Sequence, residues 1–139
     1  MEGSSLLSFI GVAAPSLRLY PRGAHVAEKL HAYTLPREKP NSRVKDLPDL
    51  ALLAGSGPFD GQVLRTAINA TFGFRKTHDL PPSLPPPPAA WTERYEVMAR
   101  DDGLPWTTLE QVYAAARAFV DPVLASQAGQ WDPVLSRWS

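Results

Sequence analysis

The chain has 139 residues, which suffice for one domain rather than two. It carries 14 basic and 14 acidic side chains, and this balance argues against an autonomous nucleic-acid-binding domain, which usually has a basic excess. The absence of cysteine excludes disulfide scaffolds, cysteine zinc sites and thiol catalysis. The 15 prolines, about twice the average share, predict a small globular domain that contains a stiff segment.

Neither a targeting segment nor a membrane span is convincing. The apolar run at 6–14 resembles the core of a signal peptide. A signal peptide has basic residues before this core, whereas here Glu2 precedes it and no basic residue does. No apolar run reaches the roughly 20 residues that cross a bilayer. We therefore expect a cytoplasmic protein that has no membrane partner.

The first half of the chain predicts one short strand and three helices. Residues 16–20 alternate between polar and apolar side chains, which is typical of a strand, and Pro21 would end it. Asn41 or Ser42 could cap the second helix, and Asp60 could cap the third. The helices are expected over residues 22–34, 42–54 and 61–71.

Six of the eight residues at 81–88 are proline, so this stretch is predicted to be a polyproline II strut. Such a strut could be a ligand for a domain of the SH3 or WW type. It could also be a rigid strap between two helical parts, and the aromatic residues nearby favour the strap.

Short helices are expected beyond the prolines. Thr92 would cap a helix over 93–101, and Thr107 with Glu110 would form a capping box for a helix that runs to about Val120. Asp121-Pro122 would begin another helix. The four tryptophans are expected to anchor these helices to the core rather than to stack on bases.

Lys29 is the first candidate for chemistry. In a helix, Val26, Leu30 and Tyr33 would form an apolar stripe, and Lys29 would lie on its flank. From there its ammonium group could reach a cleft and hold a phosphate. Helix geometry alone favours a surface lysine whose stem covers the stripe while its head stays in water.

Asp46 is the second candidate, because helical projection places it inside an apolar arc together with Arg43, with Asp49 at the rim. A buried carboxylate is costly unless it is paired. Three uses would justify it: an Arg43–Asp46 ion pair, a paired-carboxylate site for Mg²⁺ with phosphate oxygens, or a contact that orients a nucleotide. Geometry favours the ion pair. Pro48 would kink this helix unless the helix starts near Asp46.

The histidines do not predict a metal site. His25 and His31 would lie on different sides of the first helix, with no third ligand nearby. We therefore assign no metal ligand, and the chain has no glycine-rich phosphate loop either.

Two segments carry a family resemblance. YPRGAHVAEKLHAY at 20–33, followed by NSRVKDLPDLALL at 41–53, resembles the AbiEii/AbiGii-type nucleotidyltransferase toxins. The resemblance continues through 67–81 and covers about 11–100. It implies a relative of polymerase-β-like nucleotidyltransferases that uses a nucleoside triphosphate (NTP) and Mg²⁺. It also implies a bacterial toxin–antitoxin or phage-defence system, in which some relatives modify the acceptor end of tRNA.

The resemblance also assigns roles to residues. It implies that Lys29 holds the phosphates of the nucleotide, with Arg43 and Lys45 as further nucleotide-binding residues. Asp46 and Asp49 are then the candidates for the active-site acid, and the resemblance does not choose between them.

The chain departs from the family at the start of the catalytic core. In the family, a Gly-Ser is followed about ten residues later by an Asp-x-Asp or Asp-x-Glu pair that holds Mg²⁺. This sequence contains no such pair. We therefore expect the C-terminal part of such an enzyme, without its N-terminal half, inactive alone and with no cofactor of its own.

The expected fold is mainly α: the helical part of an α/β nucleotidyltransferase, with one strand at 16–20 and the strut at 81–88. Residues 1–80 would be the remnant of the core, 81–90 a linker, and 91–139 a helical tail packed on the core as one unit. The expected partner is an antitoxin or the missing N-terminal half, and tRNA would bind only to the assembled enzyme. The oligomeric state stays open. The alternative is a non-catalytic helical binding protein derived from this fold, which would bind an antitoxin or a full-length relative.

Overall fold

The computed structural model describes residues 22–36 and 44–139. The expected mainly helical fold is confirmed, while the strand expected at 16–20 lies outside the described residues. The described helices are α1 (Arg22–Thr34), α2 (Asp46–Ala54), α3 (Gly61–Arg75), the short 3-10 helix η3 (Ala89–Trp91), α4 (Thr92–Asp102) and α5 (Leu109–Leu124). The described strands are β1 (Phe59–Asp60), β2 (Gln130–Asp132) and β3 (Arg137–Trp138).

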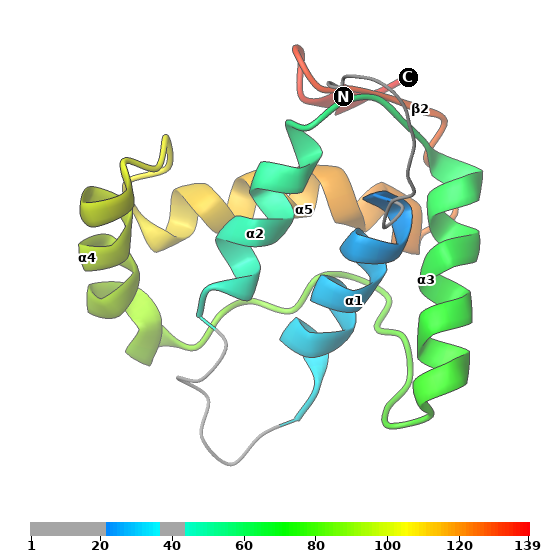
Figure 1. Cartoon of the computed structure of the whole chain (residues 1–139), viewed down its shortest axis with the longest axis horizontal. Helices are drawn as coiled ribbons and strands as arrows, with labels where there is room; N and C mark the ends of the chain where they lie inside the picture. Colours follow the sequence, from blue (N-terminus) through cyan, green and yellow to red (C-terminus); the bar gives the residue numbers. More distant parts are fainter. Residues whose placement is uncertain (1–21, 37–43) are drawn as a thin grey trace, which may run out of the picture.

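Helix α5 packs against α2, α3 and α4. Helix α1 contacts both α2 and α3 (Figure 1). Helices α1 and α2 run in opposite directions, because the start of α1 lies beside the end of α2. The candidate residues on α1 and α2 are therefore placed by one helix–helix interface.

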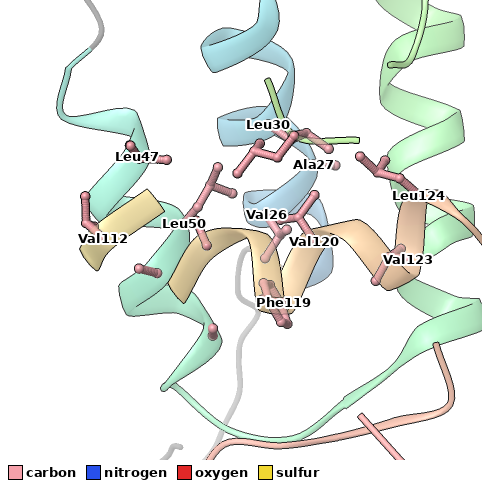
Figure 2. Packing of buried hydrophobic residues seen from close by; sticks show 14 of the residues in the cluster. Val26, Ala27, Leu30, Leu47, Leu50, Val112, Phe119, Val120, Val123 and Leu124 are labelled. Atoms are coloured by element: carbon pink, nitrogen blue, oxygen red, sulfur yellow. The ribbon is translucent and has the colours of Figure 1, made fainter. Parts of the chain in front are cut away.

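The core lies where α1, α2 and α5 meet. Apolar side chains recur along each helix at intervals of three and four residues, so each helix presents a continuous stripe to the others. Figure 2 shows these stripes converging. The labelled residues are Val26, Ala27, Leu30, Leu47, Leu50, Val112, Phe119, Val120, Val123 and Leu124.

The predicted helix break at Asp121-Pro122 is wrong, because α5 continues through Pro122 to Leu124. A proline inside a helix removes one backbone hydrogen bond and crowds the preceding turn. Here Val120 and Val123 are both buried, so the apolar stripe of α5 spans the proline. Packing of this stripe stabilises the helix across the site of the missing bond.

The capping box at the start of α5 is shifted by one residue from its predicted place. The hydroxyl of Thr108, not that of Thr107, accepts a hydrogen bond from the backbone N–H of Gln111. The side-chain carbonyl of Gln111 in turn accepts from the backbone N–H of Thr107. Gln111 therefore takes the part predicted for Glu110, and its return bond goes to Thr107, the residue before the cap, rather than to Thr108 itself.

Helix α2 begins at Asp46, later than the predicted start at 42. Pro48 then lies in the first turn, where a backbone N–H would have no acceptor within the helix, so the proline is tolerated. Asp60 caps α3 as predicted, accepting from the N–H groups of Gln62 and Val63. Helix α3 extends past the predicted end at 71 and closes at Lys76 in a left-handed conformation.

The proline segment is hydrogen-bonded to two helices, as a strap between parts of the fold would be. The hydroxyl of Tyr33 on α1 donates to the carbonyl of Pro85 at 2.7 Å, and the hydroxyl of Tyr113 on α5 donates to the carbonyl of Leu84 at 2.8 Å. Asp121 accepts from the backbone N–H of Leu84, whose side chain is buried. The segment is therefore fastened to α1 and α5.

The C-terminal residues form a small sheet where only helices were expected. Strand β2 pairs with β1 and β3, antiparallel in both cases. The indole N–H of Trp131 donates to the carbonyl of Ala54, and that of Trp138 donates to the carbonyl of Phe119. The tryptophans therefore do anchor the tail to the core, as expected, but two of them do so from strands.

Candidate functional site

The antiparallel contact of α1 and α2 brings Lys29, Asp46 and Asp49 together. The ammonium nitrogen of Lys29 lies 2.8 Å from Oδ2 of Asp49 and 3.8 Å from Oδ1 of Asp46. Asp46 and Asp49 are three residues apart and so lie on the same face of α2. In the sequence, the lysine and the two carboxylates are separate candidates, and the structure joins them in one cluster.

The three members of this cluster differ in burial. The side chain of Asp46 is only 3% exposed, which confirms its predicted position in the apolar arc, whereas those of Lys29 and Asp49 are 28% and 21% exposed. Lys29 therefore compensates a buried charge and also keeps its ammonium group within reach of solvent. Lys45, directly before α2, is exposed, and Arg43 lies outside the described residues.

A surface pocket of about 360 Å³ adjoins the cluster. Its polar side chains come from both helices and from the turn after α2, and its apolar side chains come from the last turns of α2. The lining residues are His25, Lys29, Asp49, Leu52, Leu53 and Ser56. Its volume falls near the lower end of the usual range for small-molecule sites, roughly 300–1,000 Å³.

Arg22 is a residue of this region that the sequence analysis did not single out. Its guanidinium donates to the hydroxyl of Ser56 at 2.9 Å and to the carbonyl of Pro58 at 2.7 Å, and it lies over the ring of Phe59. Burial lowers the pKa of Arg22. Its position in the sequence could have indicated this, because Arg22 is seven residues before Lys29 and so lies on the same face of α1.

The cluster does not fit the Mg²⁺ ion that the resemblance implies. Both carboxylates have an oxygen within 3.8 Å of the ammonium group of Lys29, so a cationic side chain already lies between them. Across residues 22–36 and 44–139, no three His, Asp or Glu side chains are grouped so that they could hold a metal. The predicted separation of His25 and His31 agrees with the structure, since His25 lines the pocket while His31 bonds to Thr77.

In the same described residues, no helix combines the length and the apolar character needed to cross a membrane.

Comparison with known proteins identifies the family. Residues 4–121 match the family described as nucleotidyl transferase AbiEii toxin, type IV toxin–antitoxin system. No curated protein and no solved structure matched the chain. The family match covers most of the sequence, including the α1–α2 cluster and the proline segment. The chain therefore belongs to the AbiEii nucleotidyl transferase toxin family of type IV toxin–antitoxin systems.

Proposed function

We propose that this chain supplies the nucleotide-binding part of an AbiEii nucleotidyltransferase, with Lys29 as its phosphate contact, and that it transfers no nucleotide alone. The observation that carries the proposal is the position of the Lys29 ammonium group, which Asp49 holds at 2.8 Å on the rim of the α1–α2 pocket. A lysine fixed by one carboxylate and still partly exposed can donate further hydrogen bonds to a phosphate.

The charge of the motif residues favours an anionic ligand. Arg43, Lys45 and Lys29 outnumber the carboxylates of Asp46 and Asp49 by one. Lys45 directly precedes α2, and the first turn of a helix carries a partial positive charge. Phosphates are therefore best accommodated toward the first turn of α2, within reach of Lys29.

The two carboxylates have different roles in this proposal. Asp49 lines the pocket and contacts the ammonium group closely, so it can touch a bound nucleotide and is our choice for the active-site acid. Asp46 is buried and does not line the pocket. We assign Asp46 the role of a buried counter-charge that fixes the position of the Lys29 ammonium group.

The proposed inactivity of the isolated chain rests on its sequence. Transfer of a nucleotidyl group depends on cations that neutralise the phosphates, and Asp-x-Asp or Asp-x-Glu pairs hold them in this family. The sequence contains neither pair at any position. The acids would then be supplied by residues other than those of this sequence, and their assembly with it would also restore any tRNA acceptor site. An antitoxin remains the partner that the family implies, and we place the protein in the cytoplasm.

Nucleotide binding by the purified chain tests the first part of the proposal. Isothermal titration with an NTP should show binding that Lys29→Ala weakens at least about tenfold, as expected for loss of a charged hydrogen bond. Arg94→Ala is the matched control, because Arg94 is an exposed cation on α4 and does not line the pocket. Equal affinities of the wild-type and Lys29→Ala chains would overturn the proposal.

A transfer assay tests the second part. The chain, incubated with Mg²⁺, each labelled NTP and tRNA, should yield no labelled product. Robust labelling would disprove the proposed inactivity but would leave the role of Lys29 in binding intact.

The alternative is a non-catalytic binding protein that inherited this fold. One observation favours it: Lys29 is already paired with the carboxylates of Asp46 and Asp49 without a ligand. In that case the chain would bind no nucleotide, and Lys29→Ala would change only the free energy of unfolding. The titration above, combined with a urea melt of both chains, separates the two functions.

A further inference from the structure

The α1–α2 pocket has a cationic end and an apolar end, which lie beside different turns of α2. Its cationic side chain, Lys29, lies at the end nearer the start of α2, whereas Leu52, Leu53 and Ser56 belong to the last turns of the helix and beyond. The last carbonyls of a helix carry a partial negative charge, so this far end is unsuited to phosphate. The far end is also the more apolar one.

The hydroxyl of Ser56, at the far end, faces the pocket as a hydrogen-bond acceptor. The hydroxyl of Ser56 donates its proton to the carbonyl of Leu53 and accepts from Arg22, so toward the pocket it can offer only a lone pair. Asp49 lies in the first turn of α2, one turn before Leu52 and Leu53 on the same face, so its carboxylate is a second acceptor at the border between the two ends of the pocket. A phosphate oxygen, which is also an acceptor and is negatively charged, has no partner at these two groups.

A nucleoside has the complementary chemistry. Ribose hydroxyls and the amino groups of bases donate hydrogen bonds, and carboxylates accept such bonds in nucleotide-binding and base-reading proteins. The apolar surface of Leu52 and Leu53 can cover the face of a sugar or a base. His25, on α1, lines the same pocket from the other helix.

We infer that the far end of the α1–α2 pocket binds the nucleoside part of the nucleotide. Ser56 at this end and Asp49 at its border are the acceptors for the donor groups of the nucleoside, and Leu52 and Leu53 are its apolar wall. The inference rests on the proposed nucleotide site and goes beyond it by orienting the ligand. The phosphates extend toward the start of α2, and the ribose and base lie toward its end.

The test uses two probes that separate the parts of a nucleotide. Adenosine and cytidine, followed by saturation-transfer NMR, report on the nucleoside site, and inorganic tripolyphosphate, followed by titration calorimetry, reports on the phosphate site. Leu52→Trp fills the pocket from a side chain that is 46% exposed, so the fold should tolerate the change. Val63→Trp, at an exposed position of α3, is the matched control.

The expected result is a reciprocal pattern. Leu52→Trp should abolish nucleoside saturation transfer and weaken NTP binding at least about tenfold, while leaving tripolyphosphate binding unchanged. Lys29→Ala should weaken tripolyphosphate binding and leave nucleoside binding in place. A nucleotide without ribose hydroxyls should bind the wild-type chain about tenfold less tightly, because the acceptors would lose their partners.

The remaining outcomes distinguish the inference from the function on which it rests. If tripolyphosphate binds but nucleosides do not, or if Leu52→Trp leaves nucleoside binding unchanged, the inference fails and the proposed function stands. If nucleosides bind in a Leu52-dependent way and tripolyphosphate does not bind, the pocket assignment stands and the role of Lys29 fails. If no probe binds, both fail.

Discussion

At the scale of single residues, the main feature is a lysine shared by two carboxylates of different burial. Lys29 lies closer to the partly exposed Asp49 than to the buried Asp46. Exposed ion pairs contribute little to stability, whereas neutralising or removing a partner of a buried charge is costly. Asp49 therefore makes the closer contact with Lys29, whereas the buried Asp46 should contribute more to the free energy of unfolding.

We expect Asp46→Asn and Asp49→Asn to differ in their effect on the free energy of unfolding. Asp46→Asn should lower it by about 1–3 kcal/mol, because Lys29 loses its buried charged partner and an amide takes the place of that carboxylate. Asp49→Asn should lower it by less than about 1 kcal/mol, since water screens this pair. Urea unfolding followed by circular dichroism measures both. A larger loss for Asp49→Asn would contradict the ranking.

At the scale of elements, the ends of α1 and α3 are joined by a hydrogen-bonded chain of two histidines and two threonines. Thr34 donates to the carbonyl of Leu30, so it accepts from Nε2 of His78 at 2.7 Å. Nδ1 of His78 then accepts from the hydroxyl of Thr77, which also bonds to Nε2 of His31. These bonds suit a neutral His78 with its proton on Nε2.

This histidine cluster predicts a pH dependence of stability. Burial lowers the pKa of His78, although Asp79 opposes the shift, and the ring lies 4.8 Å from that of His31. The unfolded chain therefore takes up a proton at His78 before the folded chain does. The stability from the neutral ring is complete above about pH 6.5, the unfolded value, and is lost as the pH falls toward the lower folded pKa.

Thermal melts of the wild-type chain and of His78→Gln between pH 8 and pH 5 measure this effect. The wild-type melting temperature should fall more steeply below about pH 6.5 than that of the variant. Parallel curves would show that His78 does not carry the pH dependence.

The proline strap provides a second prediction at the scale of elements. Burial raises the pKa of Tyr33, so its hydroxyl stays protonated and able to donate to Pro85. Tyr33→Phe and Tyr113→Phe each remove one hydrogen bond to the strap, and each should cost about 0.5–1.5 kcal/mol of unfolding free energy. Unchanged urea midpoints in both variants would indicate that the segment is not fastened and would favour the peptide-ligand interpretation.

At the scale of the whole molecule, one aromatic cluster connects α5 with the C-terminal sheet. Phe119 is fully buried and contacts the rings of Phe59, Trp131 and Trp138. Trp131 also bonds to the end of α2. The sheet therefore closes the end of the core that lies next to the α1–α2 pocket.

Truncating Phe119 should have a large effect on the whole fold. Phe119→Ala should cost about 3–5 kcal/mol, which approaches the total stability of many small domains. Phe74→Ala is the control, since Phe74 is 85% exposed on α3, and it should cost less than about 0.5 kcal/mol. Calorimetric melts compare the two variants, and a small loss in Phe119→Ala would show that the C-terminal sheet does not stabilise the helices.

The sequence by itself determined features that depend on near neighbours along the chain. The range of α1, the cap at Asp60, the non-helical proline segment and the burial of Asp46 all follow from local periodicity, capping and backbone chemistry. The family could likewise be recognised from two short segments of sequence. Local rules failed where packing outweighed them, at Pro122, which the apolar stripe of α5 spans.

Only the tertiary structure decided which distant residues meet. Lys29 pairs with Asp46 and Asp49, and Arg22 donates to Ser56, because of how α1 and α2 pack against each other. No periodicity within either helix encodes this geometry. The C-terminal strands were missed because their short pattern is decided by pairing with Phe59 and by the burial of Trp131. Long-range packing free energy, rather than local propensity, sets these contacts and with them the shape of the pocket.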